Sequence, residues 1–278
     1  MLAAALRRVV RLPQVVALLF AGLAIVTLAF PLSGPGFRRA AIRLWSRCLC
    51  RGCGLRLVEL PAPGARPLSA LPPGRLIVAN HISWLDIFAI DAHCPASFVA
   101  KAEIARWPLV GALVARAGTL FIERGKRRAV HRMVEHIDLN LRAGGRVAVF
   151  PEGTTGDGRS LLPFHANLVQ AALVAGVPLV PVGLRYLDAD GSPARSIEFV
   201  GDTTFVASMW RILGAPPVRC EVHPLPELVP EPAVDRHALA GRARAALAAR
   251  LGLPLQDATP ASIAALRVAS AAHPGAGR

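Results

Sequence analysis

The chain has 278 residues, of which 53% are hydrophobic, so its length fits one domain with short appendages. Its formal net charge of +14 indicates an anionic partner. Aromatic residues make up only 5% of the chain, and Tyr186 is its single tyrosine. The stacking platform of single-strand nucleic-acid binders is therefore missing, and we expect no nucleic-acid partner.

Five cysteines, an odd number, are placed without a disulfide framework, which favours a reducing compartment. Cys48, Cys50 and Cys53 lie close together, but three sulfurs with no histidine nearby make an incomplete metal site. We interpret them as small apolar residues near a membrane and expect no bound metal.

The first predicted element is an apolar helix. Residues 12–37 carry no charge, and a helix over residues 14–30 would be roughly 26 Å long, slightly short of a ~30 Å hydrocarbon core. Spanning is therefore possible but marginal. Arg7, Arg8 and Arg11 precede this helix and more arginines follow it, so a spanning helix would leave the bulk of the chain in the cytoplasm. A cleaved signal peptide fits less well, because no A-x-A site follows.

A second helix is predicted over residues 37–53. Arg39, Arg43 and Arg47 recur every four residues against an apolar face that contains Ile42, Trp45 and Leu49. This basic amphipathic helix suits an anionic leaflet, and the alternative is a helix packed against the first one. A hairpin of two helices dipping into one leaflet satisfies both, so residues 1–53 are interpreted as membrane-anchoring helices.

Beyond Gly54 the chain alternates strand and helix patterns, which predicts an α/β fold with a mixed, mostly parallel sheet flanked by helices. Strands are expected over 55–60, 75–79, 97–101, 119–122, 146–150, 179–184, 196–200 and 218–222. Helices are expected from residue 84 and over 109–117, 127–143, 166–175, 205–213 and 235–251. We assign 54–255 to this domain and 256–278, rich in alanine and proline, to a flexible tail.

The chemical centre is predicted at His81 and Asp86. Residues five apart on one helix point about 140° away from each other, so the two side chains meet only if the backbone turns between them. The sequence supplies that turn, because a buried strand ends near Ala79 and Ser83-x-x-Asp86 fits a capping box that opens a helix. A carboxylate there fixes the imidazole tautomer and leaves the other nitrogen free as a general base. The alternative is a capping aspartate beside an ordinary loop histidine.

Two further predicted strands end in polar residues. Arg124 follows one of them, and its planar fork suits an anionic oxygen cluster. The turn Glu152-Gly153-Thr154 follows the other and offers backbone N–H groups as an anion nest. Parallel strands of such a sheet end at one edge, so these groups are expected to converge with His81. Taken alone, each is also compatible with a solvated charge or a polar turn.

Together the motifs carry a resemblance to a family. Four blocks occur in the order and approximate spacing of the glycerolipid acyltransferase family: Asn80-His81-x-x-x-x-Asp86, Gly118 to Arg124, Phe150-Pro151-Glu152-Gly153-Thr154 and Val180-Pro181-Val182. The chain resembles bacterial 1-acylglycerol-3-phosphate acyltransferases over about residues 75–190. Thr155 and His165 depart from the pattern, because many relatives carry basic residues at these two places.

The resemblance implies roles for individual residues. His81 would be the catalytic base and Asp86 its orienting partner. Arg124 and the turn Glu152-Gly153-Thr154 would bind the acceptor phosphate. Asn80 would belong to the substrate site and Pro181 to its wall. Because Thr155 and His165 remove fixed positive charge, a lyso-ornithine lipid becomes an alternative acceptor to 1-acyl-sn-glycerol-3-phosphate.

The expected reaction is O-acyl transfer at the cytoplasmic face of the inner membrane, without a cofactor, from acyl-CoA or acyl carrier protein to a lysophospholipid. His81 would deprotonate the lysolipid hydroxyl as it attacks the thioester. Ser83 is a possible nucleophile, but a helix N-cap explains it more simply. Two rivals stay open: a metal-dependent hydrolase with His81, Asp86 and Glu152 as ligands, and a non-enzymatic anchor that binds membrane lipids.

Overall fold

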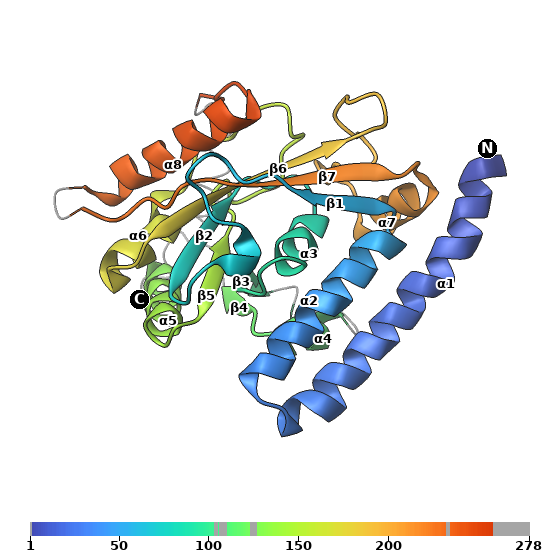
Figure 1. Ribbon diagram of the computed structural model, residues 1–278, viewed down its shortest axis with the longest axis horizontal. Coiled ribbons are helices and arrows are strands. Elements are labelled where there is room, and N and C mark those ends of the chain that lie inside the picture. Colours follow the sequence, from blue (N-terminus) through green and yellow to red (C-terminus); the bar gives the residue numbers. More distant parts are fainter. Residues whose placement is uncertain (1, 103–104, 106–109, 123–126, 232–233, 258–278) are drawn as a thin grey trace, which may run out of the picture.

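The computed structural model describes residues 2–102, 105, 110–122, 127–231 and 234–257 (Figure 1). The strands are β1 (Leu55–Glu59), β2 (Arg75–Ala79), β3 (Ser97–Lys101), β4 (Leu120–Ile122), β5 (Arg146–Val149), β6 (Leu179–Leu187) and β7 (Val218–Pro224). The α-helices are α1 (Leu2–Ala24), α2 (Pro35–Gly52), α3 (Leu85–Asp91), α4 (Val110–Arg116), α5 (Arg127–Arg142), α6 (Ala166–Ala175), α7 (Phe205–Gly214) and α8 (Arg236–Leu251). The predicted α/β fold is confirmed.

The seven strands form one sheet in the order β1-β7-β6-β2-β5-β3-β4. Every neighbouring pair is parallel except β6 and β7, so the sheet is mixed and mostly parallel, as predicted. Strand β2 lies at the centre, between β6 and β5. Its end is therefore covered on both sides, and the residues that follow it are held by two neighbouring strands.

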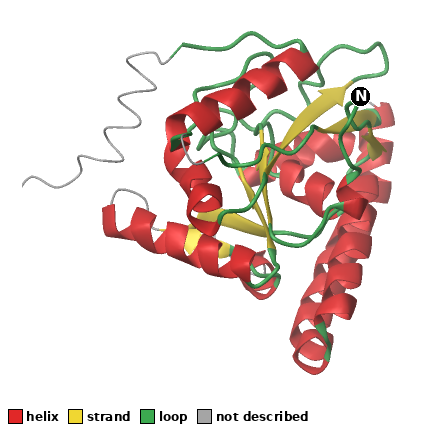
Figure 2. Cartoon of the chain, turned by 60° about the vertical axis from the view of Figure 1, so that its left-hand side comes forward, coloured by secondary structure: helices red, strands yellow, loops and turns green. Residues whose placement is uncertain are grey.

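Helices cover both faces of the sheet (Figures 1 and 2). The alternation along β2 decides which face each residue serves: Ile77 and Ala79 join a core formed with α2, α3 and α7, whereas Leu76 and Val78 join a core formed with α5, α6 and α8. Both faces of a central parallel strand are buried here, which explains the unbroken apolar run from which that strand was predicted.

The predicted strand over 196–200 is wrong. That segment is turn and irregular chain, and its Phe199 N–H donates to the Ile82 carbonyl at 3.1 Å, beyond the end of β2. Both edges of β6 are already occupied, by β2 and β7, so no slot is open beside it for another strand. The apolar residues of the segment serve instead to close over the turn after β2.

The apolar N-terminal helix is longer than predicted. Helix α1 continues through a π-helical segment (Ile25–Ala29) and a 3-10 turn (Phe30–Leu32), which gives an apolar helical stretch of 31 residues, Leu2–Leu32. By length and composition it suffices to cross a membrane. Helix α2 folds back along it, and the Trp45 indole donates to the Leu18 carbonyl at 2.7 Å. The predicted helix pair is thus a packed hairpin.

The arginines that flank the apolar segment contact the α/β domain. Arg7, Arg8 and Arg11 of α1 donate to carbonyls at the end of α7. On α2, Arg47 donates to the Ala92 carbonyl at 2.7 Å, so one member of the predicted basic stripe serves packing. A helix that crossed the bilayer with Arg7 on the far side from the domain is incompatible with these contacts. The hairpin that enters one leaflet stays a prediction.

The cysteine cluster lies in the interior. Cys50 and Cys53 are buried in the core between α2 and the sheet, and all five cysteines are free thiols. Burial raises the pKa of the Cys53 thiol to about 12. These side chains behave as small apolar groups, in line with the sequence interpretation. Of the predicted tail, 256–278, all but the first two residues lie outside the described residues.

Candidate active site

The turn between β2 and α3 brings His81 and Asp86 together. Strand β2 ends at Ala79 and α3 begins at Leu85, so the backbone reverses between the two side chains as the sequence predicted. The His81 Nδ1 and Asp86 Oδ2 atoms lie 2.8 Å apart. The Asp86 side chain is completely buried, whereas that of His81 keeps 20% of its surface exposed. The pair therefore has one buried member and one that reaches the open site.

Asp86 receives hydrogen bonds from every side. Besides the His81 ring, the backbone N–H groups of Ile82 and Ser83 donate to Oδ2 at 2.6 and 2.9 Å. The Tyr186 hydroxyl of β6 donates to Oδ1 at 2.7 Å. A buried carboxylate surrounded by donors acts as an acceptor. His81 must then carry its proton on Nδ1, which leaves Nε2 with a free lone pair.

The His81 ring is held in place by an aromatic neighbour as well. It stacks on Phe150, which follows β5, with ring centroids 4.0 Å apart and an angle of 10° between the planes. Phe98 of β3 also stacks on Phe150, with ring centroids 5.9 Å apart. The imidazole is therefore fixed by a hydrogen bond at one nitrogen and by a ring on one face, which is the preorganisation that a general base requires.

Ser83 does not cap α3 through its side chain. The Asp86 N–H, which the Ser83 hydroxyl was expected to satisfy, donates instead to the Ser83 carbonyl at 3.1 Å. Only the reverse half of the capping box forms, from Ser83 N–H to the Asp86 carboxylate. The Ser83 side chain is fully buried and its Oγ has no hydrogen-bond partner among the described residues. A hydroxyl without access to solvent is a poor candidate for a nucleophile.

Asn80 ties the end of β2 to β6. Its side-chain amide donates to the Leu184 carbonyl at 3.0 Å and accepts from the Leu184 N–H at 2.7 Å, and the residue is 1% exposed. These bonds replace two ladder bonds where β2 stops and β6 continues. Pro181 is also buried, paired with Val78 inside the sheet. Asn80 and Pro181 therefore contribute to the site by fixing the backbone around it. A direct contact with substrate stays a prediction for each.

The Glu152 carboxylate accepts hydrogen bonds from the protein backbone. Its Oε1 accepts from the His81 N–H at 2.7 Å and its Oε2 from the Leu162 N–H at 3.0 Å. The residue is 5% exposed, and burial raises the pKa of its carboxyl to about 7, against the opposing effect of those two N–H donors. Glu152 therefore positions the backbone of His81, and a role toward the acceptor phosphate remains a prediction.

Two backbone N–H groups in and near the predicted anion nest already donate hydrogen bonds within the protein. Gly153 N–H donates to Phe150 and Gly156 N–H to the His81 carbonyl, at 3.1 and 2.7 Å. Gly153 has φ +69°, and a Cβ there would lie 2.9 Å from the His165 ring, so only glycine fits. Thr154 is exposed beside this turn. It is the member of the Glu152-Gly153-Thr154 block that is open to a ligand.

Arg124 lies outside the described residues. Strand β4, which ends two residues before it, is the edge strand and is separated from β2 by β5 and β3. Three strand spacings correspond to about 14 Å across the sheet. The expected convergence is observed for the residues after β2 and β5, and the convergence of Arg124 with them stays a prediction.

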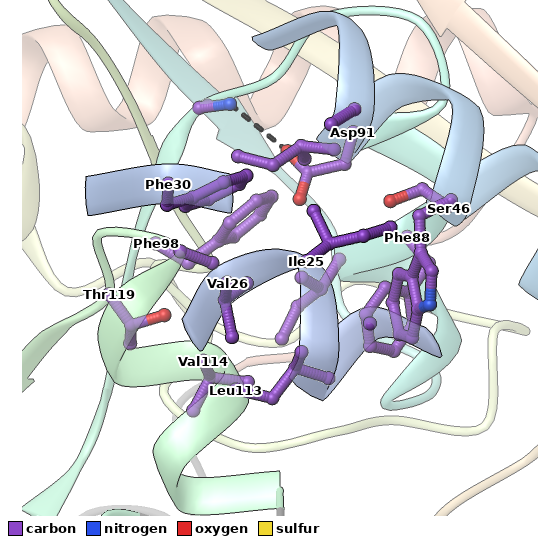
Figure 3. Close-up of a pocket in the computed structure, with 17 residues that line it drawn as sticks. Ile25, Val26, Phe30, Ser46, Phe88, Asp91, Phe98, Leu113, Val114 and Thr119 are labelled. Atoms are coloured by element: carbon purple, nitrogen blue, oxygen red, sulfur yellow. Dashed lines mark hydrogen bonds between the residues drawn. The ribbon is translucent and has the colours of Figure 1, made fainter. Parts of the chain in front are cut away.

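An apolar cavity of about 50 Å³ lies between the N-terminal hairpin and the domain (Figure 3). Its walls come from α1, α2, α3, α4 and the start of β3, and they include Phe88, Phe98 and Leu113. Phe98 connects this cavity with His81, because it stacks on Phe150 and Phe150 stacks on His81.

Sequence reasoning missed Tyr186. It lies 100 residues after Asp86 in the chain, and its hydroxyl is buried against that carboxylate. The sequence held only a weak signal: Tyr186 is the single tyrosine and lies two residues beyond the strand predicted to end at 184. No spacing rule connects it with the dyad, because the contact depends on β6 lying next to β2.

His81 and Asp86 thus form a hydrogen-bonded pair at the end of the central parallel strand, held by backbone donors, and Phe150 and Phe98 lie between this pair and the apolar cavity. Comparison with known proteins identifies the family: the acyltransferase family profile matches residues 68–185. The chain is 38% identical over 214 residues to the lyso-ornithine lipid O-acyltransferase of Pseudomonas aeruginosa, covering 76% of this chain and 78% of that one. It belongs to the acyltransferase family.

Two other relatives bear on the substrate and the fold. Identity is 40% over 159 residues to the 1-acyl-sn-glycerol-3-phosphate acyltransferase of Neisseria gonorrhoeae, and the match covers 57% of this chain but only 62% of that relative. The crystal structure of the 1-acyl-sn-glycerophosphate (LPA) acyltransferase from Thermotoga maritima has the same fold, with a TM-score of 0.64 at 17% identity, covering 88% of this chain and 96% of that one.

Proposed function

We propose that the protein transfers a fatty acyl group from an acyl thioester to the free hydroxyl of 1-acyl-sn-glycerol-3-phosphate, giving phosphatidic acid. The observation that carries the proposal is the 2.8 Å contact between His81 Nδ1 and Asp86, which leaves Nε2 as a base at the open site. Nε2 takes the hydroxyl proton while the hydroxyl oxygen attacks the thioester carbonyl carbon. Asp86 stabilises the imidazolium that forms.

The tetrahedral intermediate then collapses with loss of the thiolate. The C–S bond breaks, the ester carbonyl forms again, and the imidazolium returns its proton to the sulfur, so the products are the diacyl lipid and a free thiol. A thiol has a reference pKa near 8.5, so its departure needs little acid assistance. The cavity in Figure 3 supplies apolar walls for a fatty chain within two stacked rings of His81.

The lyso-ornithine lipid is the second candidate acceptor. Thr155 and His165 place no fixed positive charge at two positions where many relatives carry a basic residue, and the Thr155 hydroxyl donates to the Phe199 carbonyl, so it is engaged by the fold. The match to the Pseudomonas aeruginosa relative is also the longer of the two. If this lipid is the substrate, His81 and Asp86 keep the same roles.

The rival readings lose support. A metal site built from His81, Asp86 and Glu152 would need free lone pairs on both carboxylates, whereas their oxygens accept hydrogen bonds from backbone N–H groups and from Tyr186. A lipid-binding protein without turnover does not account for a histidine whose tautomer is fixed by a buried carboxylate. We place the enzyme at the cytoplasmic face of the inner membrane, with acyl-CoA or acyl carrier protein as donor.

The test is product identification. Purified full-length protein is given labelled acyl thioester with lysophosphatidate or with lyso-ornithine lipid, in equal amounts, and the labelled lipids are separated. We expect labelled phosphatidic acid to form with the higher kcat/KM. A preference for lyso-ornithine lipid would assign the second acceptor, and no labelled product with either lysolipid would refute acyl transfer to these acceptors.

A further inference from the structure

Two buried polar side chains line the apolar cavity between the N-terminal hairpin and the domain. Ser46 of α2 is 1% exposed and Asp91 of α3 is 7% exposed. Figure 3 shows the Ser46 hydroxyl and one carboxyl oxygen of Asp91 directed inward among apolar side chains. The two groups reach the cavity from neighbouring elements, because α2 packs against α3. We call Ser46 and Asp91 the polar pair.

The Ser46 hydroxyl has no hydrogen-bond partner within the described part of the chain. A serine inside a helix can donate to the carbonyl four residues earlier, here that of Ile42, but the Ser46 hydroxyl makes no such bond. A buried polar group without a partner lowers stability, and an alanine at this position would avoid that loss. Packing of the fold therefore does not account for a serine here, and its hydroxyl is directed toward the cavity.

Asp91 uses one of its two carboxyl oxygens within the described residues. Its Oδ1 accepts from the Ala96 N–H at 3.0 Å, the contact drawn as a dashed line in Figure 3. Burial raises the pKa of this carboxyl to about 8, so at neutral pH the group is a carboxylic acid that can donate as well as accept. The polar pair thus presents both donors and acceptors to the cavity.

The other walls of the cavity suit a hydrocarbon chain. They include Val26, Phe30, Phe88 and Leu113, and the half-buried Thr119 also lines it. The cavity volume is about 50 Å³, whereas one water molecule occupies roughly 30 Å³ of the liquid. The cavity therefore holds a short segment of a chain and is too small for a lipid head group.

Two aromatic rings separate the cavity from His81. Phe98 lines the cavity and stacks on Phe150 with ring centroids 5.9 Å apart, and Phe150 stacks on His81 at 4.0 Å. A group held by the polar pair is therefore distant from the carbonyl carbon that would react at His81 Nε2. On a fatty chain, such a group would lie toward the middle or the far end.

We propose that the polar pair binds a hydroxyl group on the hydrocarbon chain of an acyl substrate, so that the enzyme prefers a chain hydroxylated away from its carbonyl carbon to an unsubstituted one. The inference rests on the proposed acyl transfer and names the class of chain. A chain hydroxyl can accept from Ser46 and donate to Asp91 Oδ2, whereas an unsubstituted chain leaves Ser46 unpaired. Sites built to bind a substrate hydroxyl discriminate against analogues that lack it for this reason.

The test compares chains that differ by one hydroxyl, with the purified full-length protein and the better of the two lysolipid acceptors. In one arm the donor is a stearoyl thioester, with or without a mid-chain hydroxyl. In the other arm the hydroxyl is on the stearoyl chain of the lysolipid and the donor is unsubstituted. We expect kcat/KM to be about tenfold higher with the hydroxylated chain in one of the arms, and that arm identifies the substrate that enters the cavity.

Ser46→Ala removes the unpaired hydroxyl and favours the helix, so the fold should persist. We expect the preference for the hydroxylated chain to fall to within about twofold of none. The matched control is Ser196→Ala, because the Ser196 hydroxyl is also buried without a partner among the described residues but does not line the cavity. That variant should keep the wild-type preference, and so should Asp91→Asn, whose amide retains a donor and an acceptor.

A second measurement needs no turnover. Stabilisation against thermal unfolding by stearic acid and by mid-chain hydroxystearic acid reports binding of the chain alone. We expect the hydroxylated acid to raise the Tm more than stearic acid does in wild type, and the two acids to act equally in Ser46→Ala. If no chain gave a labelled lipid while this difference in Tm appeared, the reaction would be refuted and the site supported.

Equal kcat/KM for hydroxylated and unsubstituted chains in both arms would overturn the proposal, including the case in which a water molecule satisfies the polar pair. So would equal stabilisation of wild type by the two acids. A preference that survives in Ser46→Ala, or that is lost equally in Ser196→Ala, would also contradict it, since the discrimination would then arise outside the cavity.

Discussion

The two ends of helix α3 each bury a carboxyl group, and they treat it in opposite ways. Asp86 in the first turn is 0% exposed and accepts four hydrogen bonds, from His81, Ile82, Ser83 and Tyr186. Asp91 in the last turn is 7% exposed, and within the described part of the chain it accepts one hydrogen bond, from the Ala96 N–H at 3.0 Å. It also borders the apolar cavity (Figure 3). Burial raises the pKa of Asp91 to about 8.

The difference shows that the hydrogen-bond donors around a buried carboxyl group decide whether it carries a charge. At the start of a helix the backbone N–H groups are unpaired and available, so a carboxylate there is solvated by the protein. At the end of the helix only carbonyls remain, and the carboxyl keeps its proton. The same residue type is thus a charged partner for His81 at one end and a neutral group at the other.

The largest loss of activity should come from substitutions that break the His81–Asp86 pair at the first turn of α3. We expect His81→Ala to lower kcat by 10²- to 10⁴-fold, the usual contribution of a general base. Asp86→Asn should be nearly as severe, because an amide NH₂ facing the ring would favour the wrong tautomer. Steady-state kinetics on folded protein, checked by circular dichroism, measure both. Near-normal turnover in folded His81→Ala would exclude the mechanism.

A smaller loss is expected at Glu152, which supports the charged end from β5. In Glu152→Gln the amide NH₂ must face one of the two backbone N–H groups, of His81 or Leu162, that now donate to the carboxylate. We expect kcat to fall roughly tenfold, an order of magnitude typical of a lost positioning contact, with KM for lysophosphatidate nearly unchanged. A large rise in KM with kcat intact would show instead that Glu152 binds the acceptor.

Tyr186→Phe sharpens the comparison by removing one of the four donors at Asp86. The ring still fills the core, so we expect cooperative unfolding to persist with a loss of about 1–2 kcal/mol in the free energy of unfolding. We expect kcat to fall several-fold, and its pH profile to shift, because a less solvated carboxylate interacts more strongly with the imidazolium. A pH profile identical to wild type would limit Tyr186 to packing.

The smallest effect on the reaction is expected at Asp91, in the last turn of α3. Asp91→Asn keeps an acceptor for the Ala96 N–H, so kcat should be unchanged. The folded protein holds the Asp91 proton up to about pH 8, whereas the unfolded chain releases it near the ordinary pKa of about 4. The contribution of Asp91 to the free energy of unfolding is therefore fully present at low pH, and it falls as the pH rises from about 4 to about 8.

Chemical unfolding of wild type and Asp91→Asn at pH 5 and pH 9 measures the difference. We expect the stability of the variant relative to wild type to be higher at pH 9 than at pH 5, because most of that pH window lies between these two values. Glu152, whose pKa is also raised, contributes in the same direction in both proteins, so the comparison isolates Asp91. An equal difference at the two pH values would show that Asp91 is ionised in the folded protein at both.

Local sequence signals accounted for most of the elements and for the dyad. The apolar run before Asn80 and the turn after it place His81 and Asp86 correctly, because strand, turn and helix start are all determined within a dozen residues. Helix α8 could be predicted equally well from its own sequence. Asp235 caps its start by accepting hydrogen bonds from the N–H groups of His237 and Ala238, and Gly252 ends it. Where one segment determines its own structure, periodicity and capping residues suffice.

What sequence reasoning missed depends on the order of strands. The donors to Asp86 include Tyr186 only because β6 lies beside β2, and Asn80 and Glu152 appear polar and free in the sequence although their partners are backbone groups of Leu184 and Leu162. The segment 196–200 has a strand-like composition, but both edges of β6, the strand that precedes it in the chain, are occupied by β2 and β7. Polar residues near a site were thus assigned to substrate before the needs of the fold were known.

The contacts between α1 and α7 also set an order of events during synthesis. Arg7 and Arg8 are bonded to carbonyls 207 and 202 residues further along the chain. At a translation rate of 5–20 residues per second, these arginines wait roughly 10 to 40 s for their acceptors. During that interval the apolar side chains that α1 exposes, among them Leu2, Leu6 and Phe20, are already part of the growing chain. The N-terminal helix is thus available to the membrane before its arginines find their acceptors on α7.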